Sequence, residues 1–378
     1  MNFTEMGVAE EIVAALAKRG ITEPTPIQVA AYPVLREGKS AYLTAETGTG
    51  KTFAYLLPLL ARMDHKLEAT QVAIVAPTHE LAIQIQRECT ELAQLAGYPL
   101  RVLLLIGGTA MGRQLEKLKK KPHIVVGSPG RVADLITMGK LKAKALRAIV
   151  IDEADRLMSK EGLPALEAIL QAAPPGRQLV FASATEQPES AAHIERFEPG
   201  VVPIRTAEQP VSPTIEHLYV VCEQRDKADL LRKLWHAMEP DRAMVFVHKV
   251  ETAELVYAKL NFHHVPTVDL HALADREERK HAMEDFRSGR ARVMIASDLA
   301  ARGLDVKGLT HIFNLDAPTE SKAYLHRVGR TGRAGERGTA LTLMTEADLR
   351  LLKRWQSELG ITLARVVVRE GRVEPFAD

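Results

Sequence analysis

Short apolar segments alternate with longer amphipathic segments along the first half of the chain. Runs of four or five apolar residues are typical of buried strands, and the stretches between them have the spacing of amphipathic helices. Strands that alternate with helices favour an α/β fold with a mainly parallel sheet flanked by helices. The strands expected from this pattern are residues 41–44, 72–76, 102–106, 124–126, 148–151 and 179–182.

The alternation stops in a proline-bearing segment and then begins again. Residues 207–213 include Pro210 and Pro213, interrupt both periodicities and predict a linker. Apolar segments then recur at residues 218–221, 244–247, 293–296, 311–314 and 339–343. The sequence therefore predicts two tandem α/β domains, residues 1–206 and 214–378, joined by that linker.

Composition excludes several classes of protein. Hydrophobic residues make up 46% of the 378-residue chain, which is enough for globular cores and excludes a disordered or fibrous protein. Cys89 and Cys222 are too far apart in sequence for a metal-binding pair, and so few thiols are typical of a reducing cytoplasm. The sequence has neither a recognisable export signal nor an apolar stretch long enough for a membrane span.

A phosphate-binding loop follows the first expected strand. Residues 45–52 read Ala-Glu-Thr-Gly-Thr-Gly-Lys-Thr and lead into a helical run. Such a loop aims backbone N–H groups at phosphate oxygens, Lys51 supplies a positive charge for the β and γ phosphates, and Thr52 can hold Mg²⁺. Ala45 replaces the first glycine of the strict GxxxxGK[ST] pattern. The residues expected to bind ATP here are Thr47, Gly48, Thr49, Gly50, Lys51 and Thr52.

Acidic residues follow the expected strand 148–151, at the strand end where open α/β sheets bind ligands. Asp152, Glu153 and Asp155 belong to this cluster. An acidic cluster alone is usually a solvated loop, but acids beside a phosphate-binding loop suit metal-assisted phosphoryl transfer. We expect Asp152 to hold Mg²⁺ partly through water, and Glu153 to orient and deprotonate the attacking water.

The sequence Asp152-Glu153-Ala154-Asp155 resembles the signature of the DEAD-box family of ATP-dependent RNA helicases, and residues 1–366 resemble that family throughout. The resemblance implies two RecA-like domains. Phe3 and the segment that ends in Pro26-Ile27-Gln28 are similar to the family's Q motif, which implies that Gln28 hydrogen-bonds adenine and Phe3 supports the site by stacking. Ser183-Ala184-Thr185 is similar to the family's coupling motif, which links hydrolysis to strand separation through contacts with the acidic box.

Two further motifs of the family lie in the second domain. Asp305 ends a segment similar to the fifth motif and is implied to contact the ribose, while residues 326–333 match HRxGRxxR at every fixed position. Guanidinium groups there are suited to neutralise the γ-phosphoryl charge in the transition state when the two domains close. Arg330 and Arg333 are therefore the expected arginine fingers, and His326, with Asp155, Ser183 and Thr185, is assigned to coupling.

Several strand ends resemble the family's track for the RNA backbone. The residues assigned to RNA binding are Pro77, Thr78, His79, Gly107, Gly108, Ser128, Gly130, Arg131, Arg279, Ser297, Asp298 and Gly303. The chain departs from the family at His79 and Arg276, where arginine and glutamine are usual, at Ala272, where glycine is usual, and by serine in place of threonine at residues 128 and 297. These departures affect the RNA contacts and leave the ATP motifs intact.

The charge distribution agrees with a bound polyanion. The net charge is only +2, but residues 101–150 carry 11 basic and 2 acidic side chains, and residues 287–340 carry 10 and 5. The sequence thus predicts a basic RNA track between acidic flanks, with salt-sensitive affinity.

The resemblance implies an RNA-dependent ATPase that binds ATP, Mg²⁺ and single-stranded RNA between its domains and melts a few base pairs without translocating. We expect a cytoplasmic monomer without membrane contact, with protein or ribosomal partners supplying specificity and ribosome assembly or RNA turnover as its pathway. Two alternatives stay open: an ATP-gated RNA clamp that rarely unwinds, and a DNA helicase.

Overall fold

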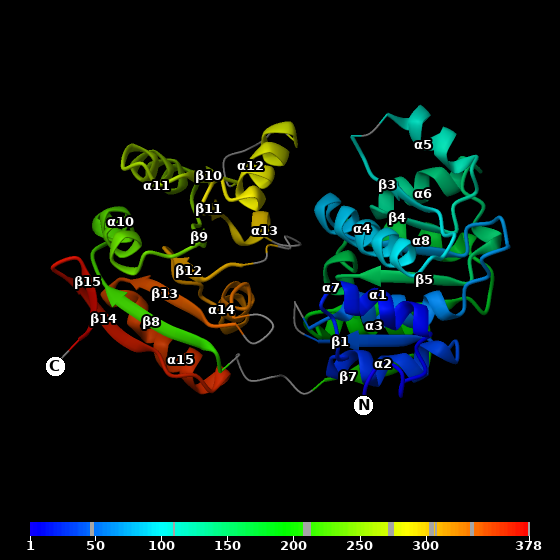
Figure 1. Cartoon of the computed structure of the whole chain (residues 1–378), viewed down its shortest axis with the longest axis horizontal. Coiled ribbons are helices and arrows are strands. Elements are labelled where there is room, and N and C mark those ends of the chain that lie inside the picture. The colour runs from blue at the N-terminus through cyan, green and yellow to red at the C-terminus, as the bar shows by residue number, and fades with distance from the viewer. Residues whose placement is uncertain are drawn as a thin grey trace. The chain divides into compact units, whose positions relative to one another are not determined.

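The chain divides into two compact units, Met1–Glu208 (unit 1) and Gln209–Asp378 (unit 2). Figure 1 shows each as a sheet with helices packed against it. The computed structural model describes residues 1–45, 49–108, 110–206, 213–270, 276–301, 306, 308–332 and 336–376, without the side chains of residues 276 and 299.

Unit 1 contains a parallel sheet of seven strands in the order β3-β4-β2-β5-β6-β1-β7. The strands are β1 Ala41–Thr44, β2 Val72–Val75, β3 Val102–Leu105, β4 Ile124–Gly127, β5 Ala148–Asp152, β6 Gln178–Ser183 and β7 Val202–Arg205. Because neighbouring strands are parallel, their carboxyl ends share one edge of the sheet and their amino ends share the other.

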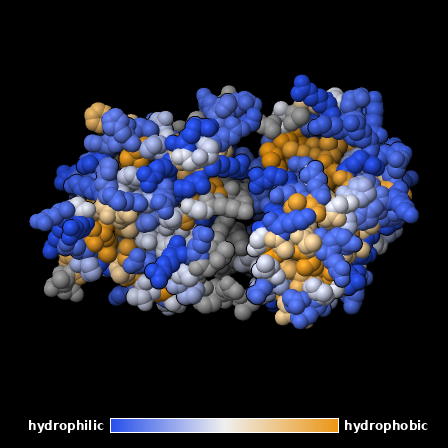
Figure 2. Space-filling model, in the orientation of Figure 1, coloured by the Kyte–Doolittle hydropathy of each residue, from blue (hydrophilic) through white to orange (hydrophobic). Residues whose placement is uncertain are grey.

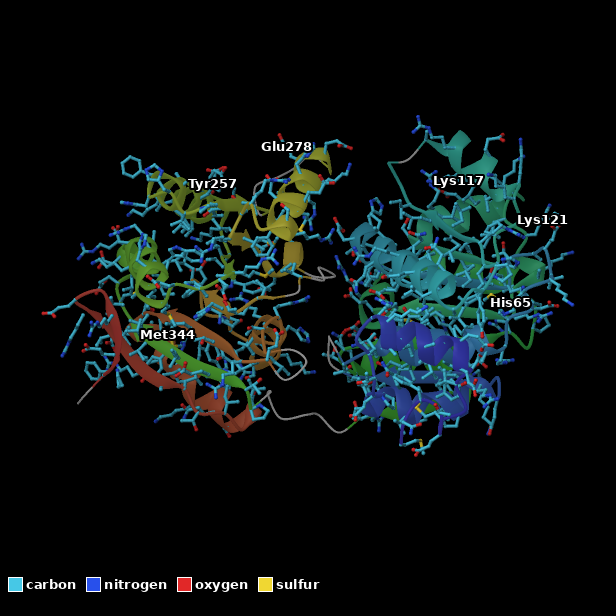
Figure 3. The ribbon with its side chains drawn as sticks, viewed as in Figure 1. His65, Lys117, Lys121, Tyr257, Glu278 and Met344 are labelled. Atoms are coloured by element: carbon cyan, nitrogen blue, oxygen red, sulfur yellow. The ribbon has the colours of Figure 1, made fainter. Side chains whose placement is uncertain are left out.

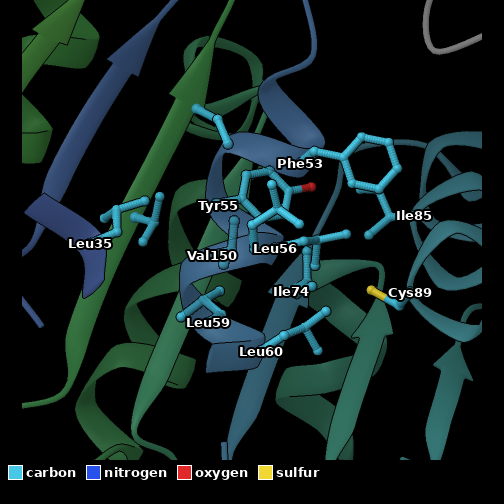
Figure 4. Close-up of a cluster of buried hydrophobic side chains, with 14 of the residues drawn as sticks. Leu35, Phe53, Tyr55, Leu56, Leu59, Leu60, Ile74, Ile85, Cys89 and Val150 are labelled. Atoms are coloured by element: carbon cyan, nitrogen blue, oxygen red, sulfur yellow. The ribbon is translucent and has the colours of Figure 1, made fainter. Parts of the chain in front are cut away.

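Helices cover both faces of this sheet. They are α1 Glu10–Lys18, α2 Pro26–Arg36, α3 Lys51–Ala61, α4 His79–Leu95, α5 Met111–Leu118, α6 Pro129–Thr137, the 3₁₀ helix η1 Ala143–Ala145, α7 Ala154–Leu157, α8 Leu163–Ala172 and α9 Pro188–Phe197. Successive strand residues point to opposite faces, so Ile74 packs with α3 and α4, whereas Val75 packs with α6 and α8. Figure 4 shows Leu56, Leu59 and Leu60 of α3 beside Ile74 in the first of these cores.

Unit 2 contains eight strands in the order β10-β11-β9-β12-β13-β8-β14-β15. The strands are β8 Ile215–Val221, β9 Ala243–Phe246, β10 Thr267–Asp269, β11 Val293–Ala296, β12 His311–Asn314, β13 Gly338–Met344, β14 Ala364–Arg369 and β15 Arg372–Pro375. All neighbouring pairs are parallel except β14 and β15, which form an antiparallel hairpin. The predicted α/β fold, with a mainly parallel sheet in each half of the chain, is confirmed.

The helices of unit 2 also pack on two faces. They are η2 Gln224–Asp226, α10 Lys227–Met238, α11 Val250–Phe262, α12 Arg276–Ser288, α13 Asp298–Ala301, α14 Ser321–Val328, η4 Glu346–Leu349 and α15 Arg350–Leu359. Tyr324 of α14 stacks on the fully buried Trp355 of α15 with ring centroids 4.4 Å apart. Within the described part of the chain, no helix has the length and apolar character that crossing a membrane requires.

Candidate functional site

The carboxyl edge of the unit 1 sheet gathers three of the predicted motifs. Strands β5, β6 and β1 are consecutive in the sheet, with Asp152 paired to Ala182 and Thr44 paired to Ser183. The phosphate-binding loop, the acidic cluster and the coupling motif follow these strand ends directly. Ala45 N donates to the Ser183 carbonyl oxygen at 3.2 Å, so the coupling motif contacts the start of the phosphate loop.

The described part of the phosphate loop is held by Gln28. Gly50 caps the N-terminus of α3 with a φ of 88°, in the left-handed region that favours glycine. A Cβ there would lie 2.4 Å from Gln28 Nε2. The Gln28 amide, which is 2% exposed, donates from Nε2 to the Gly50 carbonyl at 3.1 Å and accepts from Thr25 N at 3.0 Å. The Q motif is therefore joined directly to the loop.

Lys51 begins α3 and donates from Nζ to the Ala45 carbonyl oxygen. This hydrogen bond joins the two described ends of the loop. Thr49 also belongs to the described residues, whereas Thr47 and Gly48 lie outside them. Ala45 is 5% exposed, so its methyl group is accommodated in the core where the strict motif has glycine.

Phe3 lies in the hydrophobic core rather than on an open surface. Its ring is 1% exposed and packs in the cluster that includes Ile27 and Phe53. In this structure Phe3 packs against the Q motif from within the core, and the stacking role that the resemblance implies for it stays a prediction.

Tyr55 holds the Asp152 carboxylate and was missed by the sequence interpretation. Its hydroxyl donates to Asp152 Oδ2 at 2.8 Å, while Glu153 N donates to Oδ1 at 2.9 Å. Asp152 is 4% exposed and Tyr55 is fully buried. The available sequence signal was a tyrosine within the apolar helical run 53–60, because a buried phenol usually requires a hydrogen-bond partner.

These oxygen atoms fit a magnesium ion. Burial, the largest influence, raises the pKa of Asp152, whereas the Tyr55 hydrogen bond and the Lys51 charge lower it. A divalent cation beside the carboxylate would oppose the effect of burial, since it favours the charged form. Thr52 lies in the first turn of α3, directly after Lys51, and its hydroxyl and the Asp152 carboxylate are two ligand types that magnesium accepts.

Replacing Tyr55 with phenylalanine is expected to destabilise unit 1. The change removes one donor from a buried carboxylate, which costs about 1–3 kcal/mol of unfolding free energy. Denaturant unfolding of Tyr55→Phe should be compared with Tyr219→Phe, since the Tyr219 hydroxyl bonds no described residue and its ring is half-buried. Equal stability of the two variants would show that the Asp152 hydrogen bond contributes nothing.

Glu153 lies at the N-cap of the short helix α7 in a left-handed conformation, with a φ of 48°. Such a conformation in a residue other than glycine costs about 1–3 kcal/mol and is common at functional sites. The Glu153 side chain is 23% exposed and lies 3.8 Å from Arg156 Nη1. Unlike Asp152, Glu153 therefore has access to solvent, as the orientation of an attacking water requires.

The coupling motif contacts the acidic cluster through Thr185. Its hydroxyl donates to Asp155 Oδ2 at 2.9 Å. The Ser183 hydroxyl donates instead to the Thr185 carbonyl oxygen at 2.6 Å, and Tyr42 donates to the same oxygen at 3.3 Å. One of the two expected hydroxyl contacts with the acidic box is therefore present, and Ser183 orients the turn that carries the other.

Several residues assigned to RNA lie at the carboxyl edge of unit 1. Thr78 follows β2 and caps α4 by accepting from Leu81 N at 3.2 Å. A Cβ at Gly107 would lie 3.5 Å from His79 Nε2, so these two predicted contacts are neighbours. Ser128 caps α6, Gly130 is exposed, and Arg131 donates from Nη1 to Met111 Sδ at 3.2 Å. The half-buried Pro77 and the exposed Gly108 complete this group.

In unit 2 the structure describes only part of the predicted set. Arg279 donates to the Ala300 carbonyl at 2.9 Å, and Ser297 Oγ accepts from Ala300 N at 3.2 Å. His326 lies in the last turn of α14, and Arg330 follows that helix with 9% of its surface exposed. Asp305, Gly303, Arg333 and Ala272 lie outside the described residues, as does the side chain of Arg276.

Arg327 organises this region and was also missed from the sequence. Its guanidinium is 1% exposed and forms two 2.7 Å bonds with Asp298. It also donates to Asn314 Oδ1 and the Asp316 carbonyl, and its Nη2 lies 2.9 Å from His248 Nε2. Asp298, which the sequence assigned to RNA binding, is therefore paired with Arg327 of α14, and this ion pair links the start of α13 to α14.

The expectation that the cations of residues 101–150 line the RNA track is wrong for most of them. Parallel strands place the end of each covering helix, and the loop after it, at the amino edge of the sheet. Nine of the 11 basic residues lie at that edge: Arg101, the four lysines of residues 117–121, and the three lysines and one arginine of residues 140–147. We call these nine the amino-edge basic surface.

Known proteins resemble this chain over nearly its whole length. Residues 25–194 match the DEAD/DEAH box helicase family, and residues 226–335 match the helicase conserved C-terminal domain. The DEAD-box ATP-dependent RNA helicase CshC of Bacillus cereus is 39% identical over 94% of this chain and 91% of its own. The probable ATP-dependent RNA helicase YfmL of Bacillus subtilis is 38% identical over 94% of both. S. cerevisiae Dbp5 bound to RNA and ADP BeF3 has a TM-score of 0.85 at 28% identity, covering 97% of this chain and 95% of that one.

Proposed function

The chain belongs to the DEAD-box family of ATP-dependent RNA helicases, and we propose that it separates short RNA duplexes or remodels ribonucleoproteins, with ATP hydrolysis releasing the RNA. The observation that carries the proposal is that three features lie at one edge of the sheet: helix α3 after the phosphate-binding loop, the acidic cluster at the end of β5, and the Thr185 hydrogen bond to Asp155. A strand-displacement assay with a tailed RNA duplex, with ATP turnover recorded in parallel, tests it. RNA-stimulated turnover and ATP-dependent displacement are expected, and the absence of both would overturn the proposal.

The ATP chemistry would be divided among residues of unit 1. Lys51 would meet the β and γ phosphates, and Glu153 would orient the attacking water and accept its proton. Asp152 and Thr52 would hold magnesium, which supplies positive charge for the phosphates when bound. Gln28 is hydrogen-bonded to Gly50, so it would couple the binding of adenine to the conformation of the phosphate-binding loop.

Arg330 and Arg333 would neutralise charge on the γ-phosphoryl group in the transition state. They belong to unit 2, whereas the phosphate loop belongs to unit 1. The proposed role therefore requires these arginines to reach the nucleotide during the catalytic cycle, which makes hydrolysis depend on a conformational step. Binding of RNA to both units would favour that step and explain stimulation of the ATPase by RNA.

RNA would be held mainly through its sugar-phosphate backbone by the assigned residues around Thr78, Gly107, Ser128 and Arg279. Backbone contacts position a strand without reading its sequence. This mode suits a helicase that acts on many RNAs and takes its specificity from protein or ribosomal partners. Cytoplasmic location is part of the same proposal, and it is compatible with the free thiols of Cys89 and Cys222.

Replacing His79 with arginine is expected to strengthen RNA binding and remove part of its pH dependence. Histidine is the side chain whose charge ordinarily changes between pH 5 and 8, whereas arginine stays charged. Because one cation is added at a phosphate contact, the slope of log affinity against log salt should steepen by about 1. RNA affinity of the wild type, His79→Arg and the exposed control His236→Arg should be measured across this pH range. Identical curves for all three would exclude a role for His79 in RNA binding.

An ATP-gated RNA clamp is the alternative that shares every motif. It predicts RNA-stimulated ATP turnover without displacement of the duplex strand. A DNA helicase predicts equal stimulation of turnover by RNA and DNA, since discrimination would depend on contacts with the 2′-hydroxyl group.

A further inference from the structure

The amino-edge basic surface lies on the side of unit 1 opposite the candidate ATP and RNA site. Its nine basic residues are all exposed. Among the described residues only two of them form ion pairs, Lys119 with Glu116 at 2.6 Å and Lys121 with Glu68 at 2.9 Å. Figure 3 labels Lys117 and Lys121 of this surface, and Figure 2 shows hydrophilic residues over the end of unit 1 that carries α5. Most of its positive charge is therefore uncompensated by neighbouring acids.

Backbone hydrogen bonds set part of this surface in a row. His123 N donates to the Arg101 carbonyl at 2.9 Å, Gln71 N to the His123 carbonyl at 2.8 Å, and Arg147 N to the Gln71 carbonyl at 2.7 Å. These residues precede four consecutive strands, which places Arg101 and Arg147 about 14 Å apart at ~4.8 Å per strand. The Arg101 guanidinium donates to the Lys121 carbonyl, which adds the lysines after α5 to one end of the row.

Helix ends account for only part of this charge. The C-terminus of a helix carries roughly half a negative charge, which one nearby cation satisfies. Lys117 lies in the last turn of α5 and Lys140 follows the end of α6, so these two have such an explanation. The other lysines after α5 and those around η1 exceed what the two helix ends can offset.

Neighbouring charges in this region already repel one another. After burial, the charges of Arg101 and His65 are the next causes that lower the pKa of His123. The charge of Arg147, after burial, lowers the pKa of Arg62 in the same way. A concentration of like charge is unfavourable in the isolated chain, and a bound polyanion would relieve it.

Proximity favours RNA as that polyanion. Strand β4 separates His123 at the amino edge from Ser128 in the candidate RNA track, and its four residues span about 13 Å. A row about 14 Å long corresponds to roughly four nucleotides of one strand measured along the axis of a duplex, at ~3.4 Å of axis for each phosphate of that strand. A membrane-binding surface would in addition need apolar residues that insert between lipids. Met138 is the sole large apolar side chain among the described residues here that is markedly exposed.

We propose that the amino-edge basic surface is a second RNA-binding surface, which holds the phosphate backbone of a folded RNA segment that adjoins the single strand in the track. The proposal rests on the helicase function and deepens it. Through this surface the protein would bind structured RNA independently of the ATP site.

The test neutralises four cations of the surface together. The variant carries Lys120→Gln, Lys142→Gln, Lys144→Gln and Arg147→Gln, and its matched control carries Lys18→Gln, Lys233→Gln, Lys353→Gln and Arg369→Gln at exposed positions elsewhere. Affinity is measured for a short single-stranded RNA and for the same strand attached to a hairpin. Anionic vesicles of phosphatidylglycerol provide a third probe.

We expect the affinity of the variant for the hairpin RNA to be about tenfold lower than that of the control. The slope of log affinity against log salt should become shallower by up to about 4, because each cation accounts for about 1. Affinity for the single strand and RNA-stimulated turnover should match those of the control. Unchanged hairpin binding, or a loss restricted to vesicles, would overturn the proposal. Failure of wild-type turnover with the single strand would contradict the helicase function instead.

Discussion

Replacing Glu153 with glutamine is expected to reduce ATP turnover by about 10²–10⁴-fold, the range attributed to a positioned general base. The amide keeps the size of the side chain but cannot accept the proton of the attacking water. Binding of ATP and RNA should persist, because Lys51 and the Asp152 carboxylate with its Tyr55 hydrogen bond are unchanged. Single-turnover hydrolysis and binding of a fluorescent nucleotide measure the two properties separately.

The exposed acid Glu161 provides the control for this change. Glu161→Gln removes the same charge eight residues further along the chain without touching the sheet edge, and it should turn over ATP like the wild type. Full activity in Glu153→Gln would falsify the assignment of the base. A collapse of nucleotide binding in that variant would instead show that Glu153 maintains the structure of the turn between β5 and α7, where its backbone is left-handed.

Replacing Arg330 with lysine is expected to lower the hydrolysis rate by about 10³–10⁵-fold, the contribution of an arginine finger in related phosphoryl-transfer enzymes. Lysine keeps the positive charge but loses the planar fork that binds two phosphate oxygens at once. Binding of ATP to unit 1 should be little affected, because the phosphate loop belongs to the other unit. The expected result is therefore a loss of turnover with a nearly unchanged nucleotide affinity.

Arg337→Lys makes the same substitution at an exposed arginine of unit 2 and serves as the control. Because Arg330 is only 9% exposed, thermal unfolding of both variants should be recorded as well. A loss of turnover that follows a loss of folded protein would assign Arg330 to stability. Normal turnover in a folded Arg330→Lys protein would exclude it as an arginine finger.

Hydrophobic patterning predicted the central strands and the edge strand β3 well, but it missed the other outer strands. The expected segments 41–44, 293–296 and 311–314 coincide with β1, β11 and β12, and the other expected strands differ from the observed ones at their ends. The strands missed, β7, β10, β14 and β15, lie at or beside the ends of their sheets. An outer strand is covered less and needs a weaker apolar run, and an edge position also tolerates Pro203 in β7.

Local motifs located the site because its chemistry follows strand ends, but they did not reveal what supports it. Tyr55 and Arg327 contact partners 97 and 29 residues away, Asp152 and Asp298, and nothing in their local sequence specifies those partners. The charge of residues 101–150 illustrates the same limit. Counting along the chain showed an excess of cations but could not say at which edge of the sheet each one lies.

The β14–β15 hairpin has a consequence for protein production. Ala364 and Arg365 pair with Leu218 and Tyr219, so the hairpin occupies the side of β8 that β13 leaves open. A chain truncated before Ala364 would expose the unpaired amides of β8, and such an edge recruits strands from other molecules into aggregates. Expression fragments of unit 2 should therefore retain the hairpin through Pro375 if a dispersed preparation is required.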